Sequence, residues 1–406
     1  MYAKVTFIKF WLYFYLSEER PLIFRSPLMR LVQNWGVFPK MGIYQKLPNS
    51  KYNQILQLSL HNNVHSKLYY DGIAYFTSLE DSEKALSTLL NGFNPLEFQQ
   101  TVNGIKHEHD SLKWDHKKRI EDDIHQLAFQ KSKFHNVDNV TVDQVQAYAN
   151  KYLFSEDAVV SAVGHKLDKS TLPKGKKSDL SSIPRYFGGY RQIKTQKPPM
   201  LSPLSELDLN YFGIYFPVQS VCSKEMFTLA VLCQILGGGS AFSAGGPGKG
   251  IYSRLYDVLC RSRGVESIFV NLYQYEQISL FGITLGGEYN LNKQAFSIIL
   301  NQLLRLYDVD DVELERAKFQ TLSNQFQALE KTEEMVEYMG RSLQSCNKVY
   351  SFDEIESGVM AVNKLKIQDC ISTMLKAPPS CCLVGSNLNV EDPLQLCQRL
   401  GIPTVN

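Results

Sequence analysis

Apolar residues recur along the chain at two spacings, which predict helices and strands. In the first half the pattern predicts a strand at 72–77, a helix to 91, a long helix at 94–133 broken near Asp110, a helix at 141–152 and a strand at 158–163. A capping box of Thr141 and Gln144 opens the helix at 141–152. In the second half it predicts strands at 209–216, 267–273 and 278–285, a helical stretch at 291–341 broken near 307–311, a helix at 364–376 and a strand at 381–384. A few strands among long helices, two of them at hairpin spacing, favour an α+β fold.

The two halves end alike, with a helix, an apolar strand and a glycine, which is Gly164 in the first half and Gly385 in the second. This repetition indicates two similar domains, each a mostly antiparallel sheet packed with helices. Lysines and prolines replace the apolar pattern between the halves. We therefore expect a basic N-terminal arm at 1–68, a partial N-terminal domain at 69–166, an interdomain linker at 167–204 and a C-terminal domain at 205–406.

A glycine-rich segment at 237–250 separates two predicted helices, and seven of its fourteen residues are glycine. Glycine loses more conformational freedom on folding than any other residue, so we expect a mobile loop without helix or strand. Such a backbone can approach an extended peptide or an anion closely, whereas the alternative is a flexible linker. A phosphate-binding loop is disfavoured, because Ser243 takes the place of its first glycine and Gly250 that of its magnesium-binding hydroxyl.

Charge and the length of apolar runs indicate which classes of protein the chain can belong to. A formal net charge of +2 gives no electrostatic footprint for nucleic-acid binding. No run of about 18 apolar residues occurs that would span a membrane. No acidic residue lies between Arg20 and Tyr70, which is typical of a mitochondrial targeting segment, although Glu18 and Glu19 argue against a clean one and a poorly ordered basic arm is the alternative.

The cysteines and the histidines lead to two further predictions. All eight cysteines follow residue 221 without a Cys-x-x-Cys pair, and we expect reduced, mostly buried thiols. The histidines of the long first-half helix are scattered among charged residues, so we expect solvated side chains rather than metal ligands for His107, His109, His116 and His125.

The run LCQILGGGSAFSAGGPGKGIYSRLY, from Leu232 to Tyr256, resembles the glycine-rich loop of the alpha subunits of mitochondrial processing peptidases. These are non-catalytic members of the pitrilysin and insulinase type of peptidase, and the similarity extends over about four-fifths of the chain. The resemblance implies two similar α+β domains and a role in substrate recognition. It assigns substrate binding to Gly237, Gly238, Gly239, Ser240, Phe242, Gly245, Gly246, Gly248, Lys249 and Gly250. The first strands and first helix of that family have no clear counterpart before Tyr69.

The catalytic members of that family carry an inverted zinc motif, H-x-x-E-H, whose glutamate activates water. His61 and His65 have the spacing of its histidines, but Val64 stands at the position of the base. We interpret both histidines as surface or packing residues. The sequence predicts no catalytic and no metal-binding residue in this chain, and the resemblance places zinc in a beta subunit that would be its partner.

Four carboxylates, Glu330, Glu333, Glu334 and Glu337, are spaced to share one face of a helix. They are either a solvated helix face or an acidic stripe complementary to arginine-rich presequences.

The resemblance favours the substrate-recognition subunit of a matrix processing peptidase, which forms a heterodimer with a catalytic beta subunit and binds the presequences of imported precursors. A structural core protein of respiratory complex III is the alternative, because its subunits resemble the same family. A self-sufficient zinc peptidase is a third hypothesis, which Val64 argues against. The expected location is the mitochondrial matrix, with possible association with the inner membrane.

Overall fold

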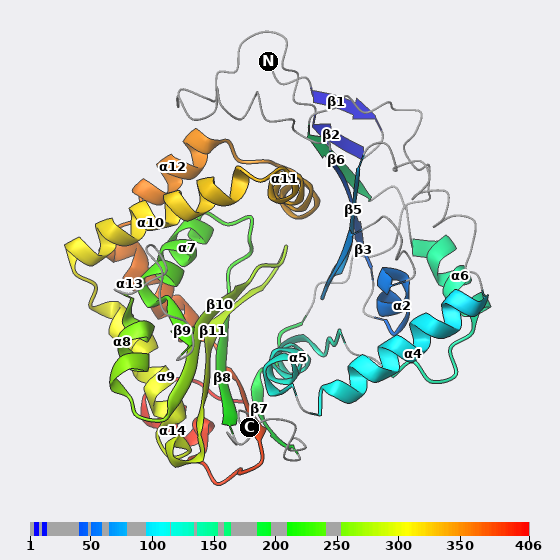
Figure 1. Ribbon diagram of the computed structural model, residues 1–406. Helices are drawn as coiled ribbons and strands as arrows, with labels where there is room; N and C mark the ends of the chain where they lie inside the picture. Colours follow the sequence, from blue (N-terminus) through cyan, green and yellow to red (C-terminus); the bar gives the residue numbers. More distant parts are fainter. Residues whose placement is uncertain are drawn as a thin grey trace. The chain divides into compact units, whose positions relative to one another are not determined.

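The computed structural model describes residues 4–7, 10–13, 40–47, 50–58, 65–78, 95–113, 115–133, 136–152, 158–163, 185–195, 209–240 and 253–405. The chain forms two compact units (Figure 1). Unit 1 comprises Met1–His109, Lys133–Ser182 and Gln325–Phe352, and unit 2 comprises Asp110–Ser132, Ile183–Asn324 and Asp353–Asn406.

Unit 1 is built on an antiparallel four-stranded sheet of order β4-β5-β3-β6. Its strands are β3 (Lys40–Lys46), β4 (His65–Tyr69), β5 (Gly72–Ser78) and β6 (Val159–Val163), and its helices are α2 (Tyr52–Leu58), α4 (Pro95–Ser111), α6 (Val142–Tyr152) and α11 (Thr332–Cys346). A separate hairpin pairs β1 (Lys4–Phe7) with β2 (Phe10–Tyr13).

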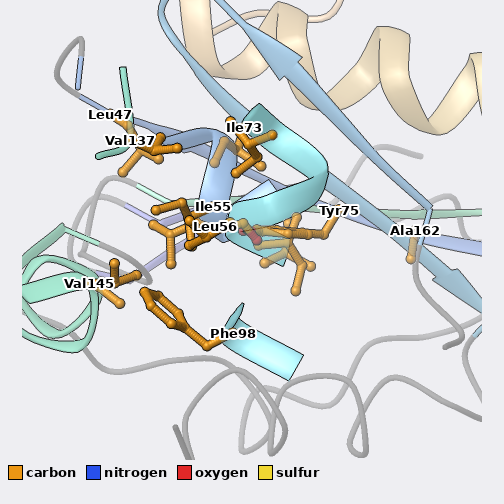
Figure 2. Close-up of a cluster of buried hydrophobic side chains, with 14 residues drawn as sticks. Leu47, Ile55, Leu56, Ile73, Tyr75, Phe98, Val137, Val145 and Ala162 are labelled. Carbon is orange, nitrogen blue, oxygen red and sulfur yellow. The ribbon is translucent and has the colours of Figure 1, made fainter. Parts of the chain in front are cut away.

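The sheet of unit 1 is buried on both faces, since alternate side chains of β5 enter different cores. Ile73 and Tyr75 pack with residues of α2, α4 and α6 (Figure 2). Ala74 and Phe76 pack with Val336 and other residues of α11. Because successive residues of a strand point to opposite faces, these two cores lie on opposite sides of the sheet.

Helix α11 approaches the sheet of unit 1 very closely. A Cβ on Gly340 would lie 1.9 Å from Cε2 of Tyr44, a β3 side chain that is 1% exposed. The Ser161 hydroxyl of β6 donates to the backbone carbonyl of Val336 at 2.8 Å. Only glycine at position 340 permits this approach.

Unit 2 is built on a six-stranded sheet of order β7-β12-β8-β11-β10-β9, in which β7 and β12 are parallel and the other neighbours antiparallel. Its strands are β7 (Gly189–Lys194), β8 (Leu209–Val218), β9 (Gly238–Ser240), β10 (Val265–Tyr273), β11 (Ser279–Glu288) and β12 (Ser380–Gly385). Its helices include α5 (His116–Phe129), α7 (Glu225–Leu236), α8 (Arg254–Arg261), α9 (Ala295–Leu304), α12 (Phe352–Met360), α13 (Lys364–Met374) and α14 (Pro393–Arg399), with short 3-10 turns η3 (Tyr289–Leu291) and η4 (Arg305–Tyr307). α10 (Asp311–Leu329) begins in unit 2 and ends in unit 1.

Helix α5 covers one face of this sheet. Ile120 and Ile124 pack against β8 and β12 and meet the backbone of Gly213. The opposite face carries α9, whose Phe296 meets Phe212 of β8 edge to face. Both units therefore have an α+β architecture with helices on both faces of a sheet, which confirms the predicted fold class.

Two histidines of α5 correct the expectation of solvated side chains. His125 is fully buried, and its Nδ1 donates to the carbonyl of Glu121 at 2.7 Å. The other nitrogen, Nε2, then accepts from the Tyr275 hydroxyl at 2.7 Å in the neutral ring. His116 is also buried, and its Nδ1 lies 3.3 Å from the carbonyl oxygen of Leu209. The prediction is wrong for both because charged neighbours on a helix do not reveal which face packs on a sheet.

The N-terminal region differs from the predicted arm at 1–68. It supplies β3, an inner strand of the unit 1 sheet, together with α2 and the edge strand β4. Because β3 and α2 lie within residues 1–68, the prediction that this region is only a basic arm is wrong. β3 was missed because Ile43 and Tyr44 are both buried, on opposite faces, so the strand lacks polar alternation.

The domain ranges also differ from the contiguous blocks expected from sequence. The region 167–204 contains β7, which pairs with β12, so it is more than a linker. The first half of the chain supplies α5 to unit 2, and the second half supplies α11 to unit 1. Six cysteines are free, and four of them are buried, Cys370, Cys381, Cys382 and Cys397, whereas Cys260 is exposed. The prediction of reduced thiols is wrong for Cys222 and Cys346, which are disulfide-bonded.

Several local predictions are confirmed. The long first-half helix breaks between α4 and α5, near Asp110 as expected. The capping box at the start of α6 is reciprocal, since the Gln144 N–H donates to the Thr141 hydroxyl and the Thr141 N–H to the Gln144 side chain, each at 3.3 Å.

Candidate functional site

Gly237, which begins the glycine-rich segment, and Ser253, which follows the segment, lie close together in unit 2. Gly237 is the C-cap of helix α7, and its N–H donates to the carbonyl of Cys233 at 2.8 Å. Gly237 has a φ of +61°, and a Cβ there would lie 2.3 Å from both Cβ and Oγ of Ser253. Ser253 immediately precedes α8 and is 5% exposed. Gly237 and Ser253 therefore lie in close contact, and position 237 requires glycine.

The first residues of the segment form an edge strand. β9 pairs with β10 in an antiparallel register that sets Gly238 opposite Phe269 and Ser240 opposite Ser267. Gly238 has a φ of +139°, and a Cβ there would lie 2.4 Å from the carbonyl oxygen of Ile268. The expectation that the glycine run holds no strand is therefore wrong for Gly238–Ser240. Backbone hydrogen bonds offset the entropy that glycine loses.

Arg254, which follows the segment in the chain, is anchored to unit 2. Its guanidinium is bidentate to the Glu313 carboxylate, at 2.8 Å from Nε and 2.7 Å from Nη2. It also donates to the carbonyls of Arg305, at 2.5 Å, and Asp308, at 2.7 Å. The Arg254 and Glu313 side chains are only 11% and 12% exposed. Sequence reasoning missed this residue because its partners lie more than 50 positions away.

The closed base of the segment therefore consists of Gly237–Ser240, Ser253 and Arg254. The structure thus describes the first four residues that the sequence assigns to substrate binding. The other six lie outside the described residues: Phe242, Gly245, Gly246, Gly248, Lys249 and Gly250.

The predicted acidic stripe lies in unit 1, and two of its four carboxylates are engaged by β4. Glu337 accepts from Lys67 and, at 2.5 Å, from the Tyr69 hydroxyl. Glu333 lies 2.8 Å from Nδ1 of His65. Burial, followed by the hydrogen bond to Glu337, raises the pKa of Tyr69 well above its usual value, so this hydroxyl stays protonated and donates.

The remaining charges of the stripe are Glu330, which is exposed just before α11, and the half-buried Glu334. Arg341 stands over the Tyr69 ring, 4.1 Å from its centroid, and brings another positive charge to the same helix. The four carboxylates are thus not a uniform acidic face.

The described part of the chain has neither a metal-binding cluster nor a membrane-spanning helix. There, no three or more His, Cys, Asp or Glu side chains are grouped so as to hold a metal ion. His65 pairs with Glu333, and His61 lies outside the described residues. Within the same ranges no helix is long and apolar enough to cross a bilayer.

Among known protein families, residues 139–321 match the model described as "Peptidase M16 inactive domain". This part of the chain is M16-like. The matched stretch holds β9, Gly237, Ser253 and Arg254, so the closed base of the glycine-rich segment lies in the M16-like part.

Curated relatives are similar at modest identity. The chain is 30% identical over 245 residues to the probable mitochondrial-processing peptidase subunit alpha of Schizosaccharomyces pombe, covering 57% of this chain and 48% of that protein. It is 30% identical over 192 residues to the subunit alpha of Solanum tuberosum, covering 46% of this chain and 38% of that one. The chain is 28% identical over 207 residues to the subunit alpha of Homo sapiens, and this match covers 50% of this chain and 39% of that one. The matched part of the chain spans less than half the length of these relatives.

Among solved structures, a chain of "Complex III2 from Candida albicans, Inz-5 bound" matches with a TM-score of 0.74. The match covers 89% of this chain and 94% of that one at 12% sequence identity. At this identity the likeness shows the fold alone.

Proposed function

We propose that this chain is the substrate-recognition subunit of a mitochondrial processing peptidase. In this role it binds the N-terminal presequences of imported precursors through the glycine-rich segment at 237–250 and presents them to a zinc-containing catalytic beta subunit. The proposed location is the mitochondrial matrix. The relatives named as alpha subunits of this peptidase support the proposal.

The observation that carries the proposal is the closed base of the glycine-rich segment. Gly237 and Gly238 allow contacts that any side chain would obstruct, and Arg254 anchors the return of the chain. A linker between two helices requires neither glycine-specific contacts nor a buried bidentate ion pair at its end. A segment between residues fixed in this way can instead present its backbone to an extended peptide.

Deleting Gly245–Gly250 from the chain in complex with its catalytic partner tests the proposal. We expect assembly and zinc content to stay unchanged, because the deletion removes no residue of the closed base. Presequence binding and processing should fall by at least about 10-fold, because the contacts that position the substrate are lost. The matched control deletes the six residues 174–179, which also contain lysine and glycine. Wild-type processing by the first variant would reduce the segment to a linker, and loss of assembly would make it structural.

A second candidate is a structural core protein of respiratory complex III, which the similarity to a chain of a complex III structure favours. Purification of the native complex separates the two functions. Recovery with a zinc-containing partner supports the peptidase, whereas recovery with cytochromes supports complex III.

A further inference from the structure

The outer edge of β9 suggests how an extended substrate is held. Among the described strands, β9 is the last of the six-stranded sheet, and β10 is the one neighbour with which it pairs. Edge strands present unpaired N–H and C=O groups that can template another strand. β9 reads Gly-Gly-Ser and is only partly buried, so bulky side chains do not shield these groups.

The register identifies the residues that face outward. The N–H of Val270 donates to the carbonyl of Gly237 at 3.3 Å, which makes this a hydrogen-bonded pair. Such pairs alternate along an antiparallel ladder, so Gly239 and Ile268 form the next one. Gly238 and Ser240 then direct their N–H and C=O groups away from β10. No hydrogen bond from the described part of the chain reaches those groups.

These two residues match the repeat of an extended peptide. Outward-facing residues two positions apart are separated by about 6.8 Å, which is also the two-residue repeat of a peptide in β conformation. Gly239 between them packs against α8, with Cδ2 of Tyr256 lying 3.3 Å from the position of a Cβ. Helix α8 thus supports one face of β9, and no described strand pairs with its outer edge.

We propose that an extended segment of the presequence adds to the outer edge of β9 and pairs with the backbone of Gly238 and Ser240. This inference rests on the proposed function and specifies how the substrate is read. Recognition at this edge depends on the peptide backbone and tolerates variation in side chains.

A presequence fits this edge better than a second copy of the chain does. Pairing of two β9 strands would join only three residues from each copy, and such a contact buries far less than the roughly 1,200 Å² of a stable dimer. In the sequence, β9 leads directly into Phe242 and Gly245–Gly250, which the proposed function assigns to the same substrate.

Proline at position 240 tests the edge directly. The Ser240 N–H faces away from β10, so Ser240→Pro removes an outward donor while the bonds of β9 to β10 remain. The matched control is Gln192→Pro on β7, the opposite edge strand of the same sheet. The N–H of Gly189 and that of Thr195 point toward the β12 side, so the parallel ladder turns the Gln192 N–H outward.

We expect Ser240→Pro to raise the Kd for a fluorescent synthetic presequence peptide, measured with the full complex, by at least about 5-fold. A single net hydrogen bond corresponds to about 2- to 13-fold, and the proline ring also obstructs the incoming strand. Gln192→Pro should leave the Kd within about 2-fold of wild type. Wild-type affinity of a folded Ser240→Pro variant would overturn the inference. Concentration-dependent dimers of the wild-type chain that Ser240→Pro abolishes would also overturn it in favour of a second copy.

Peptides N-methylated at one backbone position at a time keep the inference testable if Ser240→Pro does not fold. With the wild-type complex, edge pairing predicts that sensitivity to methylation alternates with a period of two residues, whereas uniform tolerance contradicts pairing. If deletion of Gly245–Gly250 abolishes binding while Ser240→Pro and N-methylation do not, the edge inference fails and the proposed function stands.

Discussion

Replacing Gly238 with alanine probes the closed base of the glycine-rich segment most sharply. Its φ of +139° lies in a region that L-residues rarely adopt, and holding alanine there costs about 1–3 kcal/mol. The added Cβ would also lie 2.4 Å from the carbonyl oxygen of Ile268 and 2.9 Å from Cα of Phe269. Both neighbours are backbone atoms of β10, so the contact cannot be relieved by rotating a side chain.

The strain can be relieved in only one way, by β9 moving away from β10. This sets an upper limit on the loss of stability, because β9 contributes only a few backbone hydrogen bonds, each worth about 1 kcal/mol net. We therefore expect Gly238→Ala to lower the free energy of unfolding of unit 2 by about 2–3 kcal/mol. For a unit of this size that loss corresponds to a fall in Tm of roughly 4–12 °C.

Hydrogen exchange locates the change. The Val270 N–H bonds to the carbonyl of Gly237 and should lose protection, whereas the Phe269 N–H points toward β11 and should keep it. Gly239→Ala is the matched control, because its Cβ would contact only side chains of α8, at 3.3 Å and beyond, and its φ is ordinary. We expect that control to stay within about 1 kcal/mol of wild type. Equal stability and equal Val270 protection in Gly238→Ala and Gly239→Ala would refute the reasoning.

Two further predictions concern helix α11 in unit 1. Glu337→Gln should destabilise unit 1 by about 1–2 kcal/mol in thermal melts, because the 16% exposed carboxylate loses its ion pair with Lys67. The control Glu334→Gln should change the stability by less than about 0.5 kcal/mol. Equal melts of these two variants would show that the pair contributes nothing. Gly340→Ala should cost about 3 kcal/mol, because its Cβ meets the buried Tyr44 ring, and combining it with Tyr44→Leu should cost less than the sum of the two changes. Strict additivity in this cycle would contradict the close packing.

The sequence predicted elements whose signals are local. The capping box at Thr141 and Gln144 and the helix break near Asp110 depend on residues a few positions apart, and both are present. β5 and β8 also lie where the apolar pattern places them. In these segments propensity, capping and burial agree, so the pattern is sufficient.

The missed features depend on contacts between distant residues. Helical periodicity predicts α5 and α11 but cannot tell which sheet each one covers, because that choice rests on contacts such as Ile120 with Gly213 and Val336 with Ser161. The burial of His125 depends on Tyr275, which lies 150 positions away. Strand β9 was missed for a different reason, since pairing along an edge uses only the backbone and glycine composition carries no signal for it.

The glycines of the candidate site differ in what they can reveal about function. Gly237 and Gly238 are needed by the fold, because a side chain at either position would meet Ser253 or the backbone of β10. Loss of activity on replacing them would therefore report a damaged base and not a lost substrate contact. A methyl group at Gly239 requires only a small shift of the Tyr256 side chain, and the Ser240 N–H has no role in the pairing of β9 with β10. Variants at position 240 and deletions within 245–250 thus test recognition, whereas variants at 237 and 238 test whether recognition requires a rigid base. If Gly238→Ala reduces presequence binding while Gly239→Ala does not, the base must hold the segment in one place for the substrate to bind.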